Sequence, residues 1–165
     1  MAIRPARRED VPALTGIYNH YVVHGHATFD DRPATFDERE AWFAQFAASG
    51  PHRILVAEDG AVLGWASSQP YRPHPAFARS VETSIYLAPD ARGRGLGRRL
   101  YAELFALLAA EPVHRAYAGV ALPNPASVAL HLASGFREVG RFEEYAQKHG
   151  VYVSSAWFEK ALPGA

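Results

Sequence analysis

The spacing of apolar residues changes along the chain between the periods of helices and strands. A short apolar run over residues 2–6 predicts a strand. Apolar side chains then recur at helical spacing over 9–23 and again from Thr35 or Asp37 to about residue 48, where Gly50 and Pro51 follow. The pattern predicts two helices, with Thr35 or Asp37 as the N-cap of the second.

The period shortens to that of strands after residue 52. Two apolar runs flank Glu58-Asp59-Gly60, and an Asp-Gly pair between such runs is typical of a hairpin. A β-branched run over 80–87 ends before Pro89, whereas Pro73 and Pro75 exclude the stretch before it from a central strand. The middle of the chain is therefore predicted to be a three-stranded meander.

Helical spacing returns over residues 96–110, where leucines form a stripe that ends before Pro112. A strand over 115–122 and a helix over 125–134 follow, and two further strands over 136–145 and 151–158 form a predicted hairpin. The order is strand, two helices, three strands, helix, strand, helix, two strands. It predicts one mixed α/β domain over residues 1–165, with a central, mostly antiparallel sheet of about seven strands and four helices.

Composition narrows the classes of function. Of 165 residues, 48% are hydrophobic and 21% charged, which is typical of a globular chain. Seventeen basic residues balance seventeen acidic ones, so we expect no nucleic-acid partner. The chain has no cysteine, which excludes a thiol nucleophile. It begins without an apolar signal segment, and no window approaches the roughly 20 apolar residues of a membrane span, so we expect a cytoplasmic protein without a membrane partner.

The glycine-rich segment 92–97 is the most informative one. Three glycines allow backbone N–H groups to converge at the start of a helix, whose positive dipole end favours anions. Arginines 92, 94, 98 and 99 are disfavoured there by roughly 0.3–1 kcal/mol each unless an anion offsets them. A bound pyrophosphate would accept hydrogen bonds from these N–H groups and offset the arginine charges. A glycine-rich surface turn whose arginines are simply solvated would also explain the pattern. The turn comes too late for a dinucleotide fold, and it lacks the Gly-Lys-Ser/Thr of a nucleotide-hydrolase loop.

Several motifs carry a resemblance to a known family. Arg92, Gly95 and Gly97 match the R-x-x-G-x-G signature of GNAT acetyltransferases. Further segments resemble the phosphinothricin and methionine sulfoximine (methionine sulfone) N-acetyltransferases in order and spacing. They are Tyr18-Asn19-His20, Thr28-Phe29, residues 81–87, Asn124-Pro125-Ala126-Ser127, Leu130-His131, Gly135-Phe136 and Lys148-His149-Gly150. The resemblance covers nearly the whole chain and implies the GNAT acyl-CoA N-acyltransferase fold.

The resemblance also implies an activity. It predicts transfer of the acetyl group of acetyl-CoA to the free α-amine of phosphinothricin, L-methionine sulfoximine or methionine sulfone, by direct attack and without a metal. Such an enzyme would give herbicide or antibiotic resistance, and relatives of this kind are commonly homodimers. Two alternatives stay open. One is an acetyltransferase for a polyamine, a drug amine or a protein N-terminus, and the other is a non-catalytic acetyl-CoA sensor.

Two residues are candidates for proton transfer. Glu82 is a lone carboxylate in a predicted central strand, where partial burial would raise its pKa and suit it to act as general base. A structural ion pair with Arg72 or Arg79 is the competing interpretation. His131 takes the place where related enzymes often have a tyrosine that protonates the leaving thiolate, so it is a candidate general acid. A core histidine bonded to a backbone carbonyl is the alternative.

The remaining site assignments rest on the resemblance for the coenzyme and, for the acceptor, on guanidinium groups before the strand that could clamp a substrate carboxylate or phosphinate. The predicted coenzyme-binding residues are Ile85, Tyr86, Leu87, Arg92, Gly93, Arg94, Gly95, Leu96, Gly97, Arg98, Asn124 and Ser127. The predicted acceptor-binding residues are Phe29, Arg72, Phe77 and Arg79, of which the two aromatics could equally be core residues. Three histidines at 20, 24 and 26 make a poor zinc site, so we expect no metal. Ser154 stands where the family commonly has an aspartate, a departure that bears on the acceptor pocket or a subunit contact.

Overall fold

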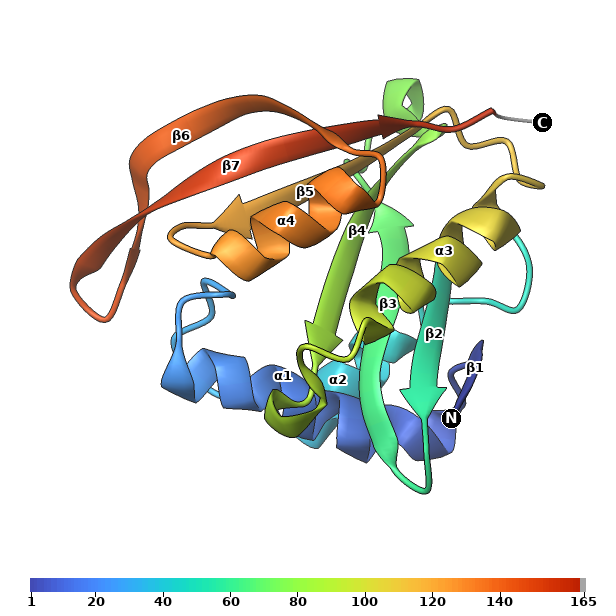
Figure 1. Cartoon of the computed structure of the whole chain (residues 1–165), viewed down its shortest axis with the longest axis horizontal. Helices are drawn as coiled ribbons and strands as arrows, with labels where there is room; N and C mark the ends of the chain where they lie inside the picture. Colours follow the sequence, from blue (N-terminus) through green and yellow to red (C-terminus); the bar gives the residue numbers. More distant parts are fainter. Residues whose placement is uncertain (164–165) are drawn as a thin grey trace.

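The strands of the described residues all join one seven-stranded sheet. The computed structural model describes residues 1–163, so residues 164 and 165 of the expected domain lie outside the described residues (Figure 1). The sheet order is β1-β2-β3-β4-β5-β7-β6, and the pair β4 and β5 is parallel whereas its other pairs are antiparallel. The strands are β1 (Ala2–Pro5), β2 (Arg53–Glu58), β3 (Val62–Pro70), β4 (Ser80–Leu87), β5 (Arg115–Ala121), β6 (Arg137–Lys148) and β7 (Val151–Ala161). The predicted order of elements and the mixed α/β class are confirmed.

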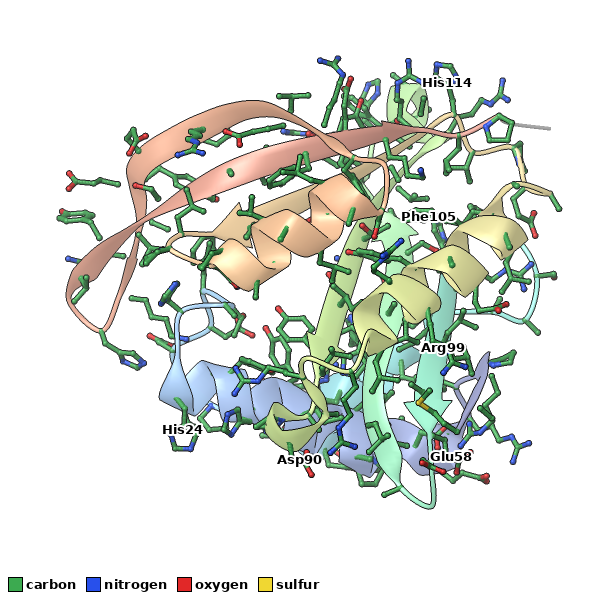
Figure 2. The ribbon with its side chains drawn as sticks, in the orientation of Figure 1. His24, Glu58, Asp90, Arg99, Phe105 and His114 are labelled. Atoms are coloured by element: carbon green, nitrogen blue, oxygen red, sulfur yellow. The ribbon has the colours of Figure 1, made fainter. Side chains whose placement is uncertain are left out.

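Four helices cover the two faces of the sheet. Helices α1 (Val11–His24) and α2 (Phe36–Phe43) pack on one face, and α3 (Leu96–Leu108) and α4 (Pro125–Ala133) lie on the other (Figure 1). The predicted leucine stripe of α3 is fully buried at Leu96, Leu100, Leu104 and Leu108. Phe105 of α3, labelled in Figure 2, contacts the Phe136 ring with centroids 5.6 Å apart and so joins α3 to the start of β6. Apolar burial on both faces therefore stabilises the sheet that carries the site.

Helix α2 is shorter than its apolar pattern predicts. It begins as expected, because the Thr35 hydroxyl accepts a hydrogen bond from the Glu38 N–H (3.2 Å) while the Glu38 carboxylate accepts one from the Thr35 N–H (2.8 Å). It ends at Phe43 rather than near residue 48. Beyond Phe43 the chain leaves the helical bonding pattern, because the Ala47 N–H donates to the His52 carbonyl (3.0 Å) rather than to the Phe43 carbonyl. A bond to the segment before β2 therefore replaces the last predicted helical turn.

The two parallel strands separate part-way along their length. Strands β4 and β5 pair only over Ser80–Glu82 and Arg115–Tyr117 within the described chain, and they then diverge (Figure 1). Side chains alternate along β4, because Val81 and Ile85 pack with the α3 cluster whereas Tyr86 packs with the α1 cluster. The last residues of β4 consequently keep one backbone edge unpaired by β5. That edge faces the opening between the strands.

Candidate functional site

The opening between β4 and β5 is a cleft of about 550 Å³, a size typical of small-ligand sites. Its walls come from β4, the turn before α3, α4, β5, the α1–α2 loop and β7. Of the predicted residues, those that line it are Phe29, Glu82, Ile85, Tyr86, Leu87, Arg92, Gly93, Gly95, Leu96, Gly97, Arg98, Asn124, Ser127 and His131. Arg94, Arg72, Phe77 and Arg79 do not line it. The structure thus brings together most of the predicted coenzyme residues and both predicted proton-transfer residues.

The turn before α3 has the backbone that its glycines predict. Gly95 is the N-cap of α3 and has a φ of 74°, a left-handed conformation that costs other L-residues roughly 1–2 kcal/mol. A Cβ on Gly97 would lie 2.9 Å from the Leu130 side chain, so α3 and α4 approach closely here. Both glycines line the cleft. Unbonded N–H groups at the start of α3 therefore face a space that an anion can enter.

The arginines of this turn divide between two surroundings. Arg92 and Arg98 line the cleft, and Arg92 Nε also donates to the Pro89 carbonyl at 3.1 Å. Arg99 extends toward the N-terminus, where its Nη1 lies 3.7 Å from the Met1 sulfur (Figure 2). Within residues 1–163, Arg92, Arg94, Arg98 and Arg99 form no ion pair with a carboxylate. Positive charge at the positive end of a helix without acidic partners favours a bound anion.

Glu82 lies on β4 at the point where β5 departs. Its side chain is half-buried and lines the cleft. Burial raises the pKa of its carboxyl group, and the positive charge of Arg72 opposes this rise in part. Arg72 makes no hydrogen bond or ion pair with Glu82 in the described chain. A carboxylate with a raised pKa on the wall of a cleft is suited to accept a proton from an amine.

His131 is buried on α4, with 3% of its surface exposed. Its Nδ1 lies 2.7 Å from the Ser127 carbonyl oxygen, and its Nε2 lies 3.0 Å from the Tyr101 hydroxyl. A carbonyl can only accept, so Nδ1 carries a hydrogen, and Nε2 of the neutral ring accepts one from Tyr101. Burial lowers the pKa of His131 and raises that of Tyr101. The carbonyl-bonded alternative is therefore observed, and His131 is paired with Tyr101 on this wall of the cleft.

Asn124 is bonded within its own helix. Its side-chain oxygen accepts a hydrogen bond from the Ser127 N–H at 3.1 Å, so it is the N-cap of α4. Asn124, Ser127 and His131 are spaced to share one face of the helix, and all three line the cleft. The cap orients this face and thereby the His131 ring.

The end of the cleft around Phe29 is aromatic. The Phe29 ring meets the Tyr145 ring edge to face, with centroids 5.7 Å apart, and Trp157 lines the same cleft. Arg72 lies instead over the rings of Tyr71 (5.1 Å) and Phe77 (5.9 Å). Three of the four predicted acceptor residues thus lie outside the lining, near the start of β4.

The lining also contains residues that the sequence prediction did not assign to the site, among them Tyr101, Tyr145 and Trp157. Tyr101 follows Leu100 of the buried leucine stripe, so the sequence already indicates that it is buried. A buried tyrosine hydroxyl needs a hydrogen-bond partner, which could have pointed to a polar residue beside it. Tyr145 and Trp157 carry no comparable signal. Their place depends on how the last hairpin packs.

Comparison with known proteins agrees with this geometry. The sequence model of the acetyltransferase (GNAT) family matches residues 15–136. The chain belongs to the GNAT family of acetyltransferases. It is 50% identical over 163 residues to a phosphinothricin N-acetyltransferase of Streptomyces coelicolor, covering 97% of this chain and 95% of the relative. It is 36% identical over 163 residues to an L-methionine sulfoximine/L-methionine sulfone acetyltransferase of Pseudomonas paraeruginosa, covering 98% and 94%.

A solved relative shares the fold of this acetyltransferase. The crystal structure of a GNAT superfamily phosphinothricin acetyltransferase from Sinorhizobium meliloti, in complex with acetyl-CoA, superposes with a TM-score of 0.92 at 33% identity. The match covers 98% of this chain and 88% of that one. The predicted fold and family are thus confirmed, and the chain is an N-acetyltransferase.

Other features of this acetyltransferase bear on the remaining expectations. Residues 1–163 contain no group of three or more histidine, cysteine, aspartate or glutamate side chains that could hold a metal ion. No helix within that stretch is long and apolar enough to cross a membrane. Ser154 lies outside the cleft lining, and its hydroxyl donates to Glu143 (3.1 Å) and accepts from the Glu144 N–H (2.9 Å). Ser154, which stands where the resemblance predicts an aspartate, therefore bonds within the last hairpin and does not line the cleft.

Proposed function

We propose that this acetyltransferase transfers the acetyl group of acetyl-CoA to the free α-amine of phosphinothricin, L-methionine sulfoximine or methionine sulfone. One observation carries the proposal. A half-buried carboxylate, Glu82, shares a cleft with an arginine-flanked anion site, in a chain that is 50% identical to a phosphinothricin N-acetyltransferase. The carboxylate can accept a proton from a reacting amine, and the anion site can bind a coenzyme pyrophosphate.

The turn 92–98 is the proposed pyrophosphate site. Arg92, Arg98 and the N–H groups around Gly95 and Gly97 supply its positive charge and donors. The backbone of Ile85–Leu87 and the α4 face at Asn124 and Ser127 are the proposed walls for the pantetheine arm. The Leu87 carbonyl already accepts from the Tyr21 hydroxyl at 2.6 Å, so the free edge available to the arm lies nearer Ile85.

Glu82 is the proposed general base. It takes a proton from the acceptor ammonium, the free amine attacks the thioester carbonyl carbon, and a C–N bond replaces the C–S bond. The chain has no cysteine, so no protein thiol relays the acetyl group. His131 and Tyr101 together are the proposed acid: the Tyr101 hydroxyl gives a proton to the departing thiolate, and the pair regains one from solvent.

Several expectations stay predictions. A homodimer would cover the last hairpin, where Tyr152 is 62% exposed and Val151 65% exposed. Trp157 of the same hairpin lines the cleft and is not part of that exposed surface. A cytoplasmic location and a role in resistance are consistent with an enzyme for small amino-acid analogues. Arg72 and Arg79 keep their proposed role toward an acceptor carboxylate only if they reach it from outside the cleft lining.

Thiol release from acetyl-CoA tests the function directly. The panel is methionine sulfone, L-methionine sulfoximine, phosphinothricin, spermidine and a peptide with a free N-terminus. We expect turnover confined to the amino-acid analogues. Turnover with spermidine or the peptide alone would overturn the acceptor class. Tight coenzyme A binding by calorimetry with no turnover on any amine would establish the non-catalytic sensor instead.

A further inference from the structure

Lys148 is a buried lysine at the tip of the last hairpin. Only 4% of its surface is exposed, and it forms no ion pair within residues 1–163. Its Nζ donates to the Thr28 carbonyl at 2.9 Å and lies 3.5 Å from the Tyr21 carbonyl. Burial of an ammonium without a direct ion pair is costly, so these carbonyl contacts and the longer-range attraction of Asp30 and Asp31 must offset a large loss of hydration. The position of Lys148 needs an explanation beyond packing.

The two carbonyls belong to segments far from the hairpin in sequence. Tyr21 lies in the last turn of α1, where the negative end of the helix dipole favours a cation. Thr28 lies in the loop between α1 and α2, which is 120 residues away from Lys148. One ammonium group therefore fastens the hairpin tip to both the end of α1 and this loop.

The fastened loop forms a wall of the cleft. Thr28 and Phe29 both line it, and Phe29 meets Tyr145 of the hairpin edge to face. The Thr28 hydroxyl is bonded to Tyr18 of α1 at 2.7 Å, which fixes the other side of the loop. Phe29 and Tyr145 thus close the wall, and Lys148 holds together the two segments that carry them.

We propose that Lys148 is a positioning residue that sets the affinity for the acceptor amine by holding the Phe29–Tyr145 wall in place. It does not line the cleft, so it acts through Thr28 and Phe29 rather than on the reacting atoms. The acceptor part of this inference rests on the proposed function. The coenzyme end lies at the turn 92–98, so the effect of Lys148 is confined to the acceptor.

Steady-state kinetics of Lys148→Met is the first test. Methionine keeps the length of the side chain and removes the ammonium. We expect the KM for the acceptor to rise about tenfold or more, because a small misplacement of a positioning wall has large effects, while the KM for acetyl-CoA stays unchanged. Lys148→Arg keeps the charge and should recover part of the loss. Lys160→Met is the matched control, since Lys160 is the only other lysine and lies over Phe105, outside the cleft lining.

A double-mutant cycle with Phe29→Ala tests the route of the effect. If Lys148 acts through the wall, Lys148→Met adds little to the acceptor KM once Phe29 is removed. Fully additive effects would overturn the proposal. An equal rise in both KM values would do the same, since it would show a general structural role.

Hydrogen exchange provides a readout that needs no acceptor. In Lys148→Met we expect faster exchange of the amides over residues 24–31, with the amides of β2, β3 and α3 unchanged, and an intermediate rate in Lys148→Arg. Unchanged exchange over 24–31 would overturn the inference. If the wild-type protein turns over none of the amino-acid analogues, the proposed function fails, and the exchange measurement still decides whether Lys148 holds the loop.

Discussion

The two ends of the cleft are built in different ways. The end proposed for the coenzyme, here called the coenzyme end, comes mainly from one continuous stretch, the end of β4, the turn 92–98 and the start of α3. The end proposed for the acceptor, here called the acceptor end, combines Phe29 from a loop, Glu82 from β4 and Tyr145 and Trp157 from the last hairpin. The first is shaped by backbone conformation, which short-range sequence dictates. The second depends on contacts between segments more than a hundred residues apart, so single side chains control its shape.

This difference predicts which changes affect chemistry and which affect binding. Changes at the acceptor end alter proton transfer or acceptor affinity and leave coenzyme binding intact. Changes at the turn weaken coenzyme binding and leave the reacting groups in place. The variants below separate the two ends.

The largest effect is expected for Glu82→Gln. The amide has nearly the same shape but cannot accept the ammonium proton, so kcat/KM for the acceptor should fall by about 10²–10⁴. Coenzyme A affinity, measured by calorimetry, should not change. Glu103→Gln, at an exposed site on α3, is the control. Near-normal turnover by Glu82→Gln would show that another group is the base.

The next effect is expected for Gly95→Ala at the coenzyme end. Alanine at a φ of 74° costs roughly 1–2 kcal/mol, so coenzyme A affinity should fall about tenfold as the turn adjusts. The KM for the acceptor at saturating acetyl-CoA should stay unchanged. Gly16→Ala is the matched control, because a Cβ there meets nothing within 4 Å. Equal loss at both ends would argue against their independence.

A smaller effect is expected for Arg72→Gln, read from the pH dependence of kcat/KM. Arg72 lowers the pKa of Glu82 through its charge, whereas burial raises it. When that charge is removed, the effect of burial dominates. The pKa of Glu82 therefore rises, and Glu82 stays protonated up to a higher pH. The acid side of the profile should therefore move to higher pH. Arg7→Gln, at an exposed site before α1, should leave the profile in place. A shift to lower pH would contradict the assignment of Glu82.

The smallest effect is expected for Ser154→Asp, which restores the residue common in the family. It places a second carboxylate beside Glu143 and removes the hydroxyl donor, so the free energy of unfolding in urea should fall by roughly 0.5–1 kcal/mol. The acceptor KM should not change, since Ser154 lies outside the cleft lining. Ser154→Ala separates the lost hydrogen bonds from the added charge. A changed acceptor KM would instead connect the hairpin surface to the site.

Much of the fold was predictable from local patterns. Alternation along residues 80–87, the leucine stripe of α3 and the Thr35 capping box all depend on spacings of two to four residues, which backbone geometry makes regular. The end of α2 was not predictable, because the Ala47 N–H donates to the His52 carbonyl and not to the Phe43 carbonyl that it would have reached in a longer helix. A contact with a later segment overrides helical propensity there.

The candidate site divides in the same way. Spacing and residue type predicted that the glycine-rich turn, Glu82 and His131 belong to one site, and the structure places them on the lining of one cleft. They did not show that His131 bonds to Ser127 and Tyr101, nor that Arg72 and Phe77 lie beside the cleft rather than in it. Those facts depend on which helices face each other across the sheet.

By itself, the sequence determined the order of elements, the glycine-rich anion turn and the carboxylate on β4. These follow from the conformations open to each residue and its near neighbours. The tertiary structure alone decided where β4 and β5 part, which aromatics enclose the acceptor end and that Lys148 fastens the loop to the hairpin. The reason is physical: local dihedral preferences extend over a few residues, whereas these contacts join segments that meet only after the whole sheet has assembled.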